Sequence, residues 1–590
     1  MTDSRASLFL CLTSALVVAA FAAQAQGVGQ PVPLGPPPGV DSLPEPAGTT
    51  LKVVPSPLFE TQPAKPREPG TGHFELQELK APDPEAVGIL DDRQGGFGPT
   101  MWQGTQAATL RRLLPQIPVA NGSRVARALA RRLLLTAAAA DGGSAGSPPI
   151  LELRAERLYA MGETEGLAAL LKSAPSAITS PALSRLKVDA FLLAGDAKAA
   201  CAEAATQPGT ADSRLQVFCM LSNGKALEAN MALDLMRDRK DTDHAFIAAA
   251  EAMSGTPPAK VDKLSNPTAL HLAAFAAAKL PLPADTAANA PPPLLTAIIA
   301  SPAASAETRL LAAERAEALG VIDTDALRKL YAGTAFTPEQ QQATLTQGDK
   351  SPRGRVLLLR AAQAEPAPAT RAELVSRLLA ASVERGAFAA TARLYAPVIA
   401  EIKPAPDLAP FAPALARALY AAGRPDTAGN WLALVKSDPG LGRAADDLWA
   451  LARLGHHGGA DTSPPAAIAA WHGARDLPPE AAERRAAITF ALLQAVGDQV
   501  PAAEWLSLLS GPLASTQPAP KPALKAMLRA SAEALRLGET VLLALISLGE
   551  GGLDKADPDT LNRAVVFLRM VGLDREARDL AIEAALANGA

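Results

Sequence analysis

Residues 415–432 read LARALYAAGRPDTAGNWL and give the clearest indication of the fold. The small residue Ala416 and the bulky residue Leu419 lie three positions apart, a spacing that places both on one face of a helix. Gly423 then permits a tight reversal of the chain. The small residue Ala428 beyond it lets a second helix approach the first closely. The stretch therefore predicts two short helices packed as a hairpin.

The same pattern recurs elsewhere in the chain. Near the C-terminus it centres on Gly572, with Leu568 before it and Ala577 after it, and looser copies centre on Gly162 and Gly195. These units resemble the tetratricopeptide repeat family. The resemblance implies a right-handed α-solenoid of helix-turn-helix repeats, in which each helix pair stacks on the next. The alternative is a helical bundle without repeats.

Helical periodicity extends over the chain from about residue 105 onward. Apolar residues recur at spacings of three and four between breakers such as Pro208-Gly209, and period-two alternation is almost absent. We therefore predict an all-α fold. The predicted parts are an N-terminal helical cap region at 71–149, helical repeats at 150–285 and 294–460, and C-terminal helical repeats at 466–590.

The first 25 residues are typical of a secretory signal peptide. Arg5 precedes an apolar run at 8–23, and Ala23-Gln24-Ala25 matches a cleavage site, so we expect cleavage after Ala25. An uncleaved anchor is the alternative, but about 16 apolar residues reach only about 24 Å, short of a hydrocarbon core of about 30 Å. No later segment is long and apolar enough to span a membrane. We therefore expect a periplasmic or secreted protein.

A proline-rich segment follows the signal peptide. Twelve prolines fall between residues 31 and 69, and proline fixes the backbone and removes a hydrogen-bond donor. We predict that residues 26–70 form a disordered linker without a core. The alternative is a proline-rich ligand for a partner.

Composition and charge exclude several classes of protein. Hydrophobic residues make up 48 % of the chain, which excludes a wholly disordered protein. The net charge is −4, from 56 basic and 60 acidic residues, and a nucleic-acid binder would normally show a basic excess. Three cysteines are too few for a scaffold built on disulfides.

Two of the three cysteines are predicted to form a disulfide bond. Cys11 leaves with the signal peptide, so Cys201 and Cys219 remain. Each lies nine residues from Thr210, in a breaker that reverses the chain between two predicted helices, so the two thiols come level in an antiparallel hairpin. Export supplies the oxidising compartment. The alternative is two reduced cysteines in the core.

Phe97, Met101 and Trp102 are candidates for docking a partner, because they cluster in a chain with only 4 % aromatic residues. The alternative is that they cap the first helices. Farther along, Arg124, Arg127 and Arg131 share one face of a predicted helix. That face is a candidate site for a membrane surface or an acidic partner, and the alternative is a solvated outer face.

Sequence patterns of enzymes and metal sites are weak in this chain. Residues 142–146 fit G-x-S-x-G, but a predicted helix precedes them where the motif needs a strand. His456, His457, Asp461 and His472 contain residue types that bind zinc, but they lack the spacing of a zinc site and a flexible Gly-Gly sequence follows the adjacent pair. We predict no catalytic residue, metal or cofactor.

The prediction for function is an exported, non-enzymatic α-solenoid scaffold or adaptor that binds other proteins of the cell envelope. The alternative is a peptidoglycan enzyme or enzyme regulator, by analogy with the soluble lytic transglycosylases, in which a helical superhelix precedes a catalytic domain. In this chain helical patterns continue through residues 564–587, so such a domain is not expected. Digestion of peptidoglycan by the purified protein separates the two hypotheses.

Overall fold

The computed structural model describes residues 83–142, 146–175, 178–206, 212–239, 243–345, 348–456, 465–474, 477–509 and 519–589. Contacts divide the chain into two units, Met1–Glu78 and Leu79–Ala590. All described residues belong to the second unit, which we call the helical body. The predicted signal peptide and linker lie outside the described residues.

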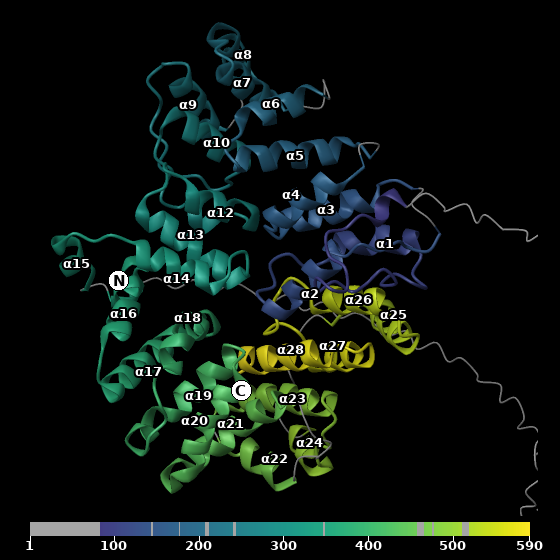
Figure 1. The fold of residues 1–590 in the computed structure, drawn as a ribbon, viewed down its shortest axis with the longest axis vertical. Coiled ribbons are helices and arrows are strands. Elements are labelled where there is room, and N and C mark those ends of the chain that lie inside the picture. The colour runs from purple at the N-terminus through teal and green to yellow at the C-terminus, as the bar shows by residue number, and fades with distance from the viewer. Residues whose placement is uncertain are drawn as a thin grey trace, which may run out of the picture. The chain divides into compact units, whose positions relative to one another are not determined.

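The helical body is built from helices, which confirms the prediction of an all-α fold (Figure 1). Within the described ranges, β-structure is limited to two isolated bridges, Leu90 with Thr136 and Gln106 with Asp141. The elements before residue 180 are η1 (Pro84–Ala86), α1 (Ala107–Leu113), η2 (Leu114–Gln116), α2 (Arg124–Leu135), α3 (Ile150–Ala160) and α4 (Thr164–Ser173).

Short helices follow one another through the rest of the body. Those up to residue 320 are α5 (Pro181–Leu193), α6 (Ala197–Ala205), α7 (Ser213–Ser222), α8 (Ala226–Asp238), α9 (His244–Met253), α10 (Ala269–Ala278), α11 (Thr286–Asn289), α12 (Pro292–Ala300) and α13 (Ala306–Leu319). The next are α14 (Thr324–Gly333), α15 (Pro338–Leu345), η3 (Gly348–Lys350), α16 (Pro352–Ala364), α17 (Pro368–Glu384), α18 (Phe388–Ala400), η4 (Pro406–Phe411), α19 (Ala412–Ala421), α20 (Pro425–Ser437), η5 (Pro439–Leu441) and α21 (Gly442–Leu454). The last are α22 (Pro465–His472), α23 (Pro479–Ala495), α24 (Ala502–Leu509), α25 (Pro522–Glu533), α26 (Leu537–Leu548), α27 (Pro558–Met570) and α28 (Asp574–Ala587).

Helix starts follow from the local sequence. At α5, Ser180 accepts a hydrogen bond from the Leu183 N–H at 3.1 Å, and Pro181 occupies the first helical position. A serine cap satisfies an N–H that has no partner within the helix, and proline is tolerated there because that position needs no donor. Asp557 and Pro558 begin α27 in the same way.

Several helix pairs share one type of glycine turn. After α19, Gly423 has φ of 68°, its N–H donates to the Tyr420 carbonyl at 3.0 Å, and the next N–H donates to Leu419 at 2.9 Å. After α27, Gly572 has φ of 85° and the same two hydrogen bonds. This left-handed backbone favours glycine. The turn joins α3 to α4, α5 to α6, α7 to α8, α17 to α18, α19 to α20 and α27 to α28.

Two hydrophobic cores lie inside the helical body. The smaller core contains residues between Val188 and Ala316, from α5 to α13. The larger core contains residues from before and after that stretch, between Phe97 and Leu186 and between Leu310 and Ala585. Because both include residues of α5 and α13, these two helices connect the cores.

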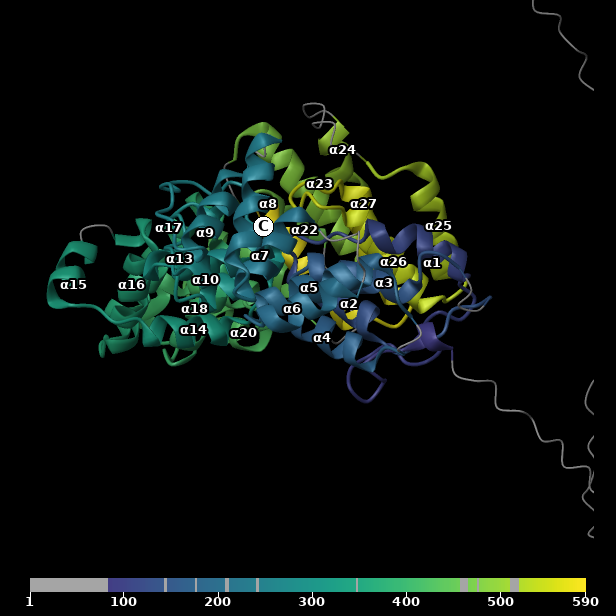
Figure 2. The same ribbon diagram turned by 90° about the horizontal axis from the view of Figure 1, so that it is seen from above.

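The first and last helices of the body contact each other. Helix α2 packs against α26 and α28, and both views show α2 beside α26 (Figures 1 and 2). The Gly538 N–H of α26 donates to the Met101 carbonyl at 3.0 Å, and the Thr105 hydroxyl donates to Glu539 at 3.1 Å. An open solenoid needs no such contact, because each repeat touches only its neighbours.

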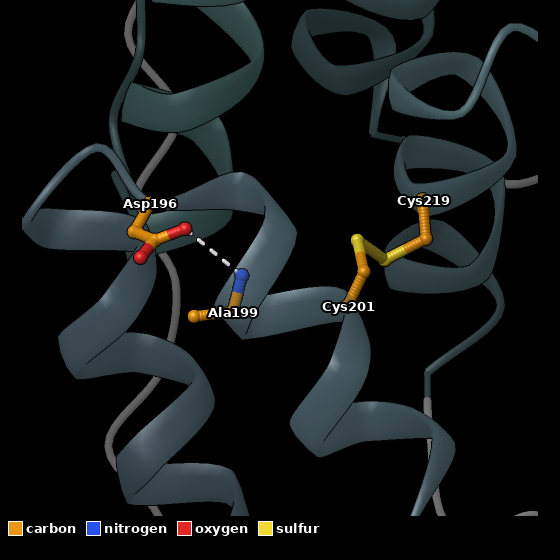
Figure 3. The surroundings of a disulfide bond; sticks show 4 residues. All are labelled: Asp196, Ala199, Cys201 and Cys219. Atoms are coloured by element: carbon orange, nitrogen blue, oxygen red, sulfur yellow. Dashed lines mark hydrogen bonds between the residues drawn. A yellow bond between two sulfur atoms is a disulfide. The ribbon is translucent and has the colours of Figure 1, made fainter.

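A disulfide bond joins Cys201 on α6 to Cys219 on α7, as predicted (Figure 3). The two Cα atoms are 5.6 Å apart, within the range that a disulfide requires. Asp196 begins α6 by accepting a hydrogen bond from the Ala199 N–H at 2.9 Å. The breaker between the two helices, residues 207–211, lies outside the described residues.

Candidate functional site

The three apolar docking candidates lie in the larger core. Met101 and Trp102 are 1 % and 4 % exposed, and Phe97 is also buried. Met101 and Trp102 pack against Gly538, where an added Cβ would lie 2.7 Å from atoms of both residues. This burial favours the alternative that they cap the first helices, while docking of a partner at these residues stays a prediction.

The three arginines of α2 form ion pairs with residues of other helices and turns. Arg124 pairs with Glu317 at 2.6 Å, whereas Arg127 and Arg131 both pair with Glu163, at 2.7 and 3.2 Å. Arg127 is buried, and burial lowers its pKa. Arg131 has the most exposed side chain of the three, at 43 %, so this face of α2 is mostly covered by the body itself.

Glu317 of α13 is the centre of a buried ionic cluster. Its side chain is fully buried and receives hydrogen bonds from Arg124, from Arg393 of α18 at 2.9 Å and from the Thr324 hydroxyl at 2.7 Å. Burial alone would raise the pKa of Glu317, but the two guanidinium groups and the hydroxyl bring it below its usual value. The carboxylate is therefore held in its charged form between three helices.

A second carboxylate lies in the same region. Glu583 of α28 accepts hydrogen bonds from the Ser123 hydroxyl and, at 3.4 Å, from the Val125 N–H. Burial raises its pKa, and these donors and the charge of Arg393 oppose that effect. Together, Glu317 and Glu583 join the start of α2 to α13, α18 and α28, so we interpret this cluster as a structural joint of the body.

A cavity of about 470 Å³ lies where α5 meets the first turns of α7, α9 and α10. Its floor includes the buried apolar residues Val188, Leu192 and Phe246. Its charged and titratable lining residues are Arg185, Asp189, Asp212, Arg214, Asp243 and His271. Burial raises the pKa of Asp189, against a hydrogen bond from Tyr159 and the charge of Arg185.

A chain of hydrogen bonds on the cavity wall has the residue types of a catalytic triad. His271 Nε2 lies 2.9 Å from Asp243 Oδ1, and His271 Nδ1 lies 2.8 Å from the Thr268 hydroxyl oxygen. Both partners are helix caps: the Thr268 oxygen accepts the His271 N–H, and the Asp243 carboxylate accepts the Phe246 N–H. Because two helix starts use these atoms, we interpret the chain as a capping network.

Among α5 to α13, the most exposed apolar surface lies on α8. Leu227, Met231 and Leu235 are 77 %, 69 % and 49 % exposed, and their spacing of four places them on one side of the helix. We call these three residues the α8 face. The opposite side of α8 packs into the smaller core through Ala229, Leu233 and Met236. Contiguous exposed apolar side chains are typical of sites that bind other proteins.

The α8 face is not among the sites predicted from the sequence, although a signal is present. Apolar residues lie on two sides of α8, and an amphipathic helix that packs by one side needs only one of them. The sequence does not say what covers each side. Only the packing of α8 on α7 shows that one of its two apolar sides stays exposed.

The metal candidates are not brought together where the structure describes them. The Nδ1 atom of His472 lies 2.7 Å from a Glu504 oxygen, and His456 is at the end of a described range. His457 and Asp461 lie outside the described residues. In the described ranges, no group of three or more His, Cys, Asp or Glu residues has an arrangement that could hold a metal ion.

Two further findings concern membrane-spanning helices and similarity to known proteins. None of the helices in the described ranges is long and apolar enough to cross a membrane. No family model, curated protein or solved structure matches this sequence.

Proposed function

We propose that the chain is an exported, non-enzymatic adaptor that binds other proteins of the cell envelope through the α8 face. The observation that carries this proposal is the row of three exposed apolar side chains on α8. A helix that presents a row of this kind can pack against a helix of another protein. The disulfide bond joins α6 to α7, the helix on which α8 packs, and so ties the support of this surface covalently.

Export is part of the same proposal. The disulfide bond between Cys201 and Cys219 supports an oxidising compartment, since such bonds are rare in reducing ones. We propose that a signal peptide is cleaved after Ala25 and that the mature protein is periplasmic or secreted. The recurring glycine turns support divergent tetratricopeptide-like repeats, for which we propose the right-handed stacking of that family.

A crosslinking pull-down from the cell envelope tests the adaptor function. The bait is the exported protein, compared with a variant carrying Leu227→Gln, Met231→Gln and Leu235→Gln, because glutamine keeps helix propensity and removes the apolar surface. Specific envelope proteins should crosslink to the unmodified bait and be lost with the variant. An identical set of crosslinked proteins for both baits would reject the α8 face as the binding surface.

Peptidoglycan digestion tests the non-enzymatic part. The purified mature protein should leave isolated peptidoglycan undigested. Release of any muropeptide would favour the alternative of a cell-wall enzyme. A helical superhelix alone does not support that alternative, because one fold serves many functions.

A further inference from the structure

We propose that Asn121 is a site of covalent modification, where attack by the neighbouring peptide nitrogen converts the side-chain amide to aspartate and isoaspartate. Asn121 is followed by Gly122 in the loop that leads from η2 into α2. Asparagine is among the thermolabile residues of proteins. The proposal goes beyond the adaptor function and does not depend on the α8 face.

The reaction needs only the chain and water. The Gly122 nitrogen gives up its proton to solvent and forms a bond to Cγ of Asn121. The side-chain nitrogen takes a proton from solvent and leaves as ammonia, so that a succinimide ring remains. One water molecule then opens the ring at either of its two carbonyls. Cleavage between Cγ and the ring nitrogen gives aspartate, whereas cleavage at the other carbonyl gives isoaspartate, in which the chain runs through Cγ.

Three asparagines of the chain precede a glycine, and they are Asn121, Asn223 and Asn588. Two of the three glycine nitrogens are engaged in helix ends. The Gly224 N–H donates to the Leu221 carbonyl at 3.0 Å. The Gly589 N–H donates to the Leu586 carbonyl at 3.2 Å. Within the described ranges the Gly122 N–H has no hydrogen-bond partner, and Gly122 is exposed. Its nitrogen therefore loses its proton without first breaking a bond of the fold.

The Asn121 side chain folds back over the peptide that attacks it. Its Oδ1 atom accepts the Ser123 N–H at 3.1 Å, which is the hydrogen bond of an Asx turn around Gly122. This N–H polarises the amide carbonyl and stabilises the negative charge that develops on Oδ1 during the attack. Gly122 has φ of 74° and open space around it. By contrast, the Asn588 amide donates to the Ala584 carbonyl at 2.8 Å, which ties it to α28.

The modified residue lies between two anchors of the loop. Before Asn121, Glu550 accepts two backbone N–H groups of the loop at 2.9 and 3.0 Å. After it, Ser123 caps α2 and donates to Glu583 of α28. Isoaspartate puts one extra carbon atom into the backbone between these anchors, and it adds a negative charge to a loop that already binds two carboxylates. We therefore expect isoaspartate to loosen the contact of α2 with α28.

Ageing of the purified protein in labelled water tests the site. Folded protein and protein unfolded in guanidinium chloride are kept in a mildly alkaline buffer made with heavy-oxygen water. Both are then digested with trypsin in ordinary water, so that modification during digestion adds no label. Peptides 113–124, 215–225 and 579–590 report on the three asparagines separately.

The expected result is selective labelling in the folded protein. Heavy oxygen should enter peptide 113–124 at least about fivefold faster than either of the other two peptides, because only there are the reacting groups held together. In the unfolded protein the three rates should agree within about twofold, since the same dipeptide reacts without the fold.

Two variants test the effect on the joint. Asn121→Gln lengthens the side chain by one carbon and makes ring closure slow, so peptide 113–124 should lose its label. After ageing, hydrogen exchange in the first turns of α2 and in α28 should be at least about threefold faster in the parent protein than in this variant. Fresh Asn121→Asp carries the charge without the extra backbone carbon, and its exchange should change less than that of the aged parent.

Two outcomes would overturn the proposal. One is labelling at Asn223 or Asn588 in the folded protein that is as fast as labelling at Asn121. The other is labelling at Asn121 only after unfolding. Labelling without any change of hydrogen exchange in α2 and α28 would leave the site in place and refute its effect on the joint. The labelling comparison uses only the parent chain, so it decides the site even if Asn121→Gln fails to fold.

Discussion

The larger core joins distant parts of the sequence, whereas the smaller core is built from helices that follow one another. Thr105 and Glu539, at the border of the larger core, are 434 positions apart and share a hydrogen bond. In the smaller core, α5 to α13 pack mainly on their sequence neighbours, and a disulfide joins α6 to α7 across a separation of 18 residues.

The two cores also differ in which of their side chains are covered. The larger core covers most of Arg124 and Arg127 of α2 and buries Met101 and Trp102, although Leu506 and Leu509 of α24 stay exposed. The smaller core leaves one side of α8 exposed and has a covalent bond in addition to its packing. The locally built region therefore carries the exposed apolar side that we propose as a binding surface.

The largest expected effect comes from breaking the ionic joint of the larger core. Glu317→Ala leaves Arg124 and Arg393 without their shared carboxylate, and we expect a loss of about 3–5 kcal/mol in the free energy of unfolding. Urea unfolding monitored by circular dichroism measures this loss. Glu373→Ala, which removes an exposed ion pair with Arg377 on α17, should cost less than about 0.5 kcal/mol. Equal losses would mean that the joint contributes no more than a surface pair.

The disulfide of the smaller core should have the next largest effect. Cys201→Ser with Cys219→Ser opens a loop of 18 residues, and we expect the free energy of unfolding to fall by about 3 kcal/mol. Hydrogen exchange should show the loss in α5 to α10 and leave α27 and α28 protected. Reductant should destabilise the disulfide-bonded protein and have no effect on the double variant. Alkylation of both thiols in the denatured, non-reduced exported protein would refute the bond.

A smaller effect is expected at the contact between the first and last helices. Gly538→Ala places a Cβ about 2.7 Å from the Met101 carbonyl oxygen, so we expect the free energy of unfolding to fall by about 1–3 kcal/mol. Thermal or urea unfolding measures this change. Gly429→Ala is the matched control, because Gly429 lies inside α20 and has open space around it. That change should stabilise the protein by about 0.5–1 kcal/mol. Stabilisation by both changes would mean that α26 does not approach Met101 closely.

The smallest expected effect is the pH dependence of the smaller core. Burial alone would raise the pKa of Asp243, but hydrogen bonds from His271 and the Phe246 N–H, with the charge of Arg214, bring it below its usual value. A lowered pKa gives stability that is present above the pKa of the unfolded state, about 3.9, and is lost as the pH falls through the folded value.

Asp243→Asn measures this contribution, because asparagine keeps the helix cap. The unmodified protein and the variant should differ in free energy of unfolding at pH 7, and the difference should shrink below about pH 4. A difference that stays constant between pH 7 and pH 3 would contradict the prediction.

Local sequence determined the helices, their turns and the disulfide bond. Gly423 and Gly572 mark turns that need a left-handed backbone, and this requirement acts over a few residues. Cys201 and Cys219 are joined by a single reversal of the chain, so helix geometry alone brings their thiols level. Each of these features depends on residues that are close in the sequence, and helical periodicity and breaker residues specify their relation.

Tertiary structure alone decided which surfaces are covered. Arg127 lies on a polar face of α2, yet Glu163 and the body bury it, and Trp102 is covered by α26 from the far end of the sequence. On α8, Leu233 and Met231 belong to two apolar sides of one helix, and packing on α7 hides the first and leaves the second exposed. Helical periodicity tells which residues share a side, but only the neighbouring helices, brought together by contacts over long separations, determine which side meets water.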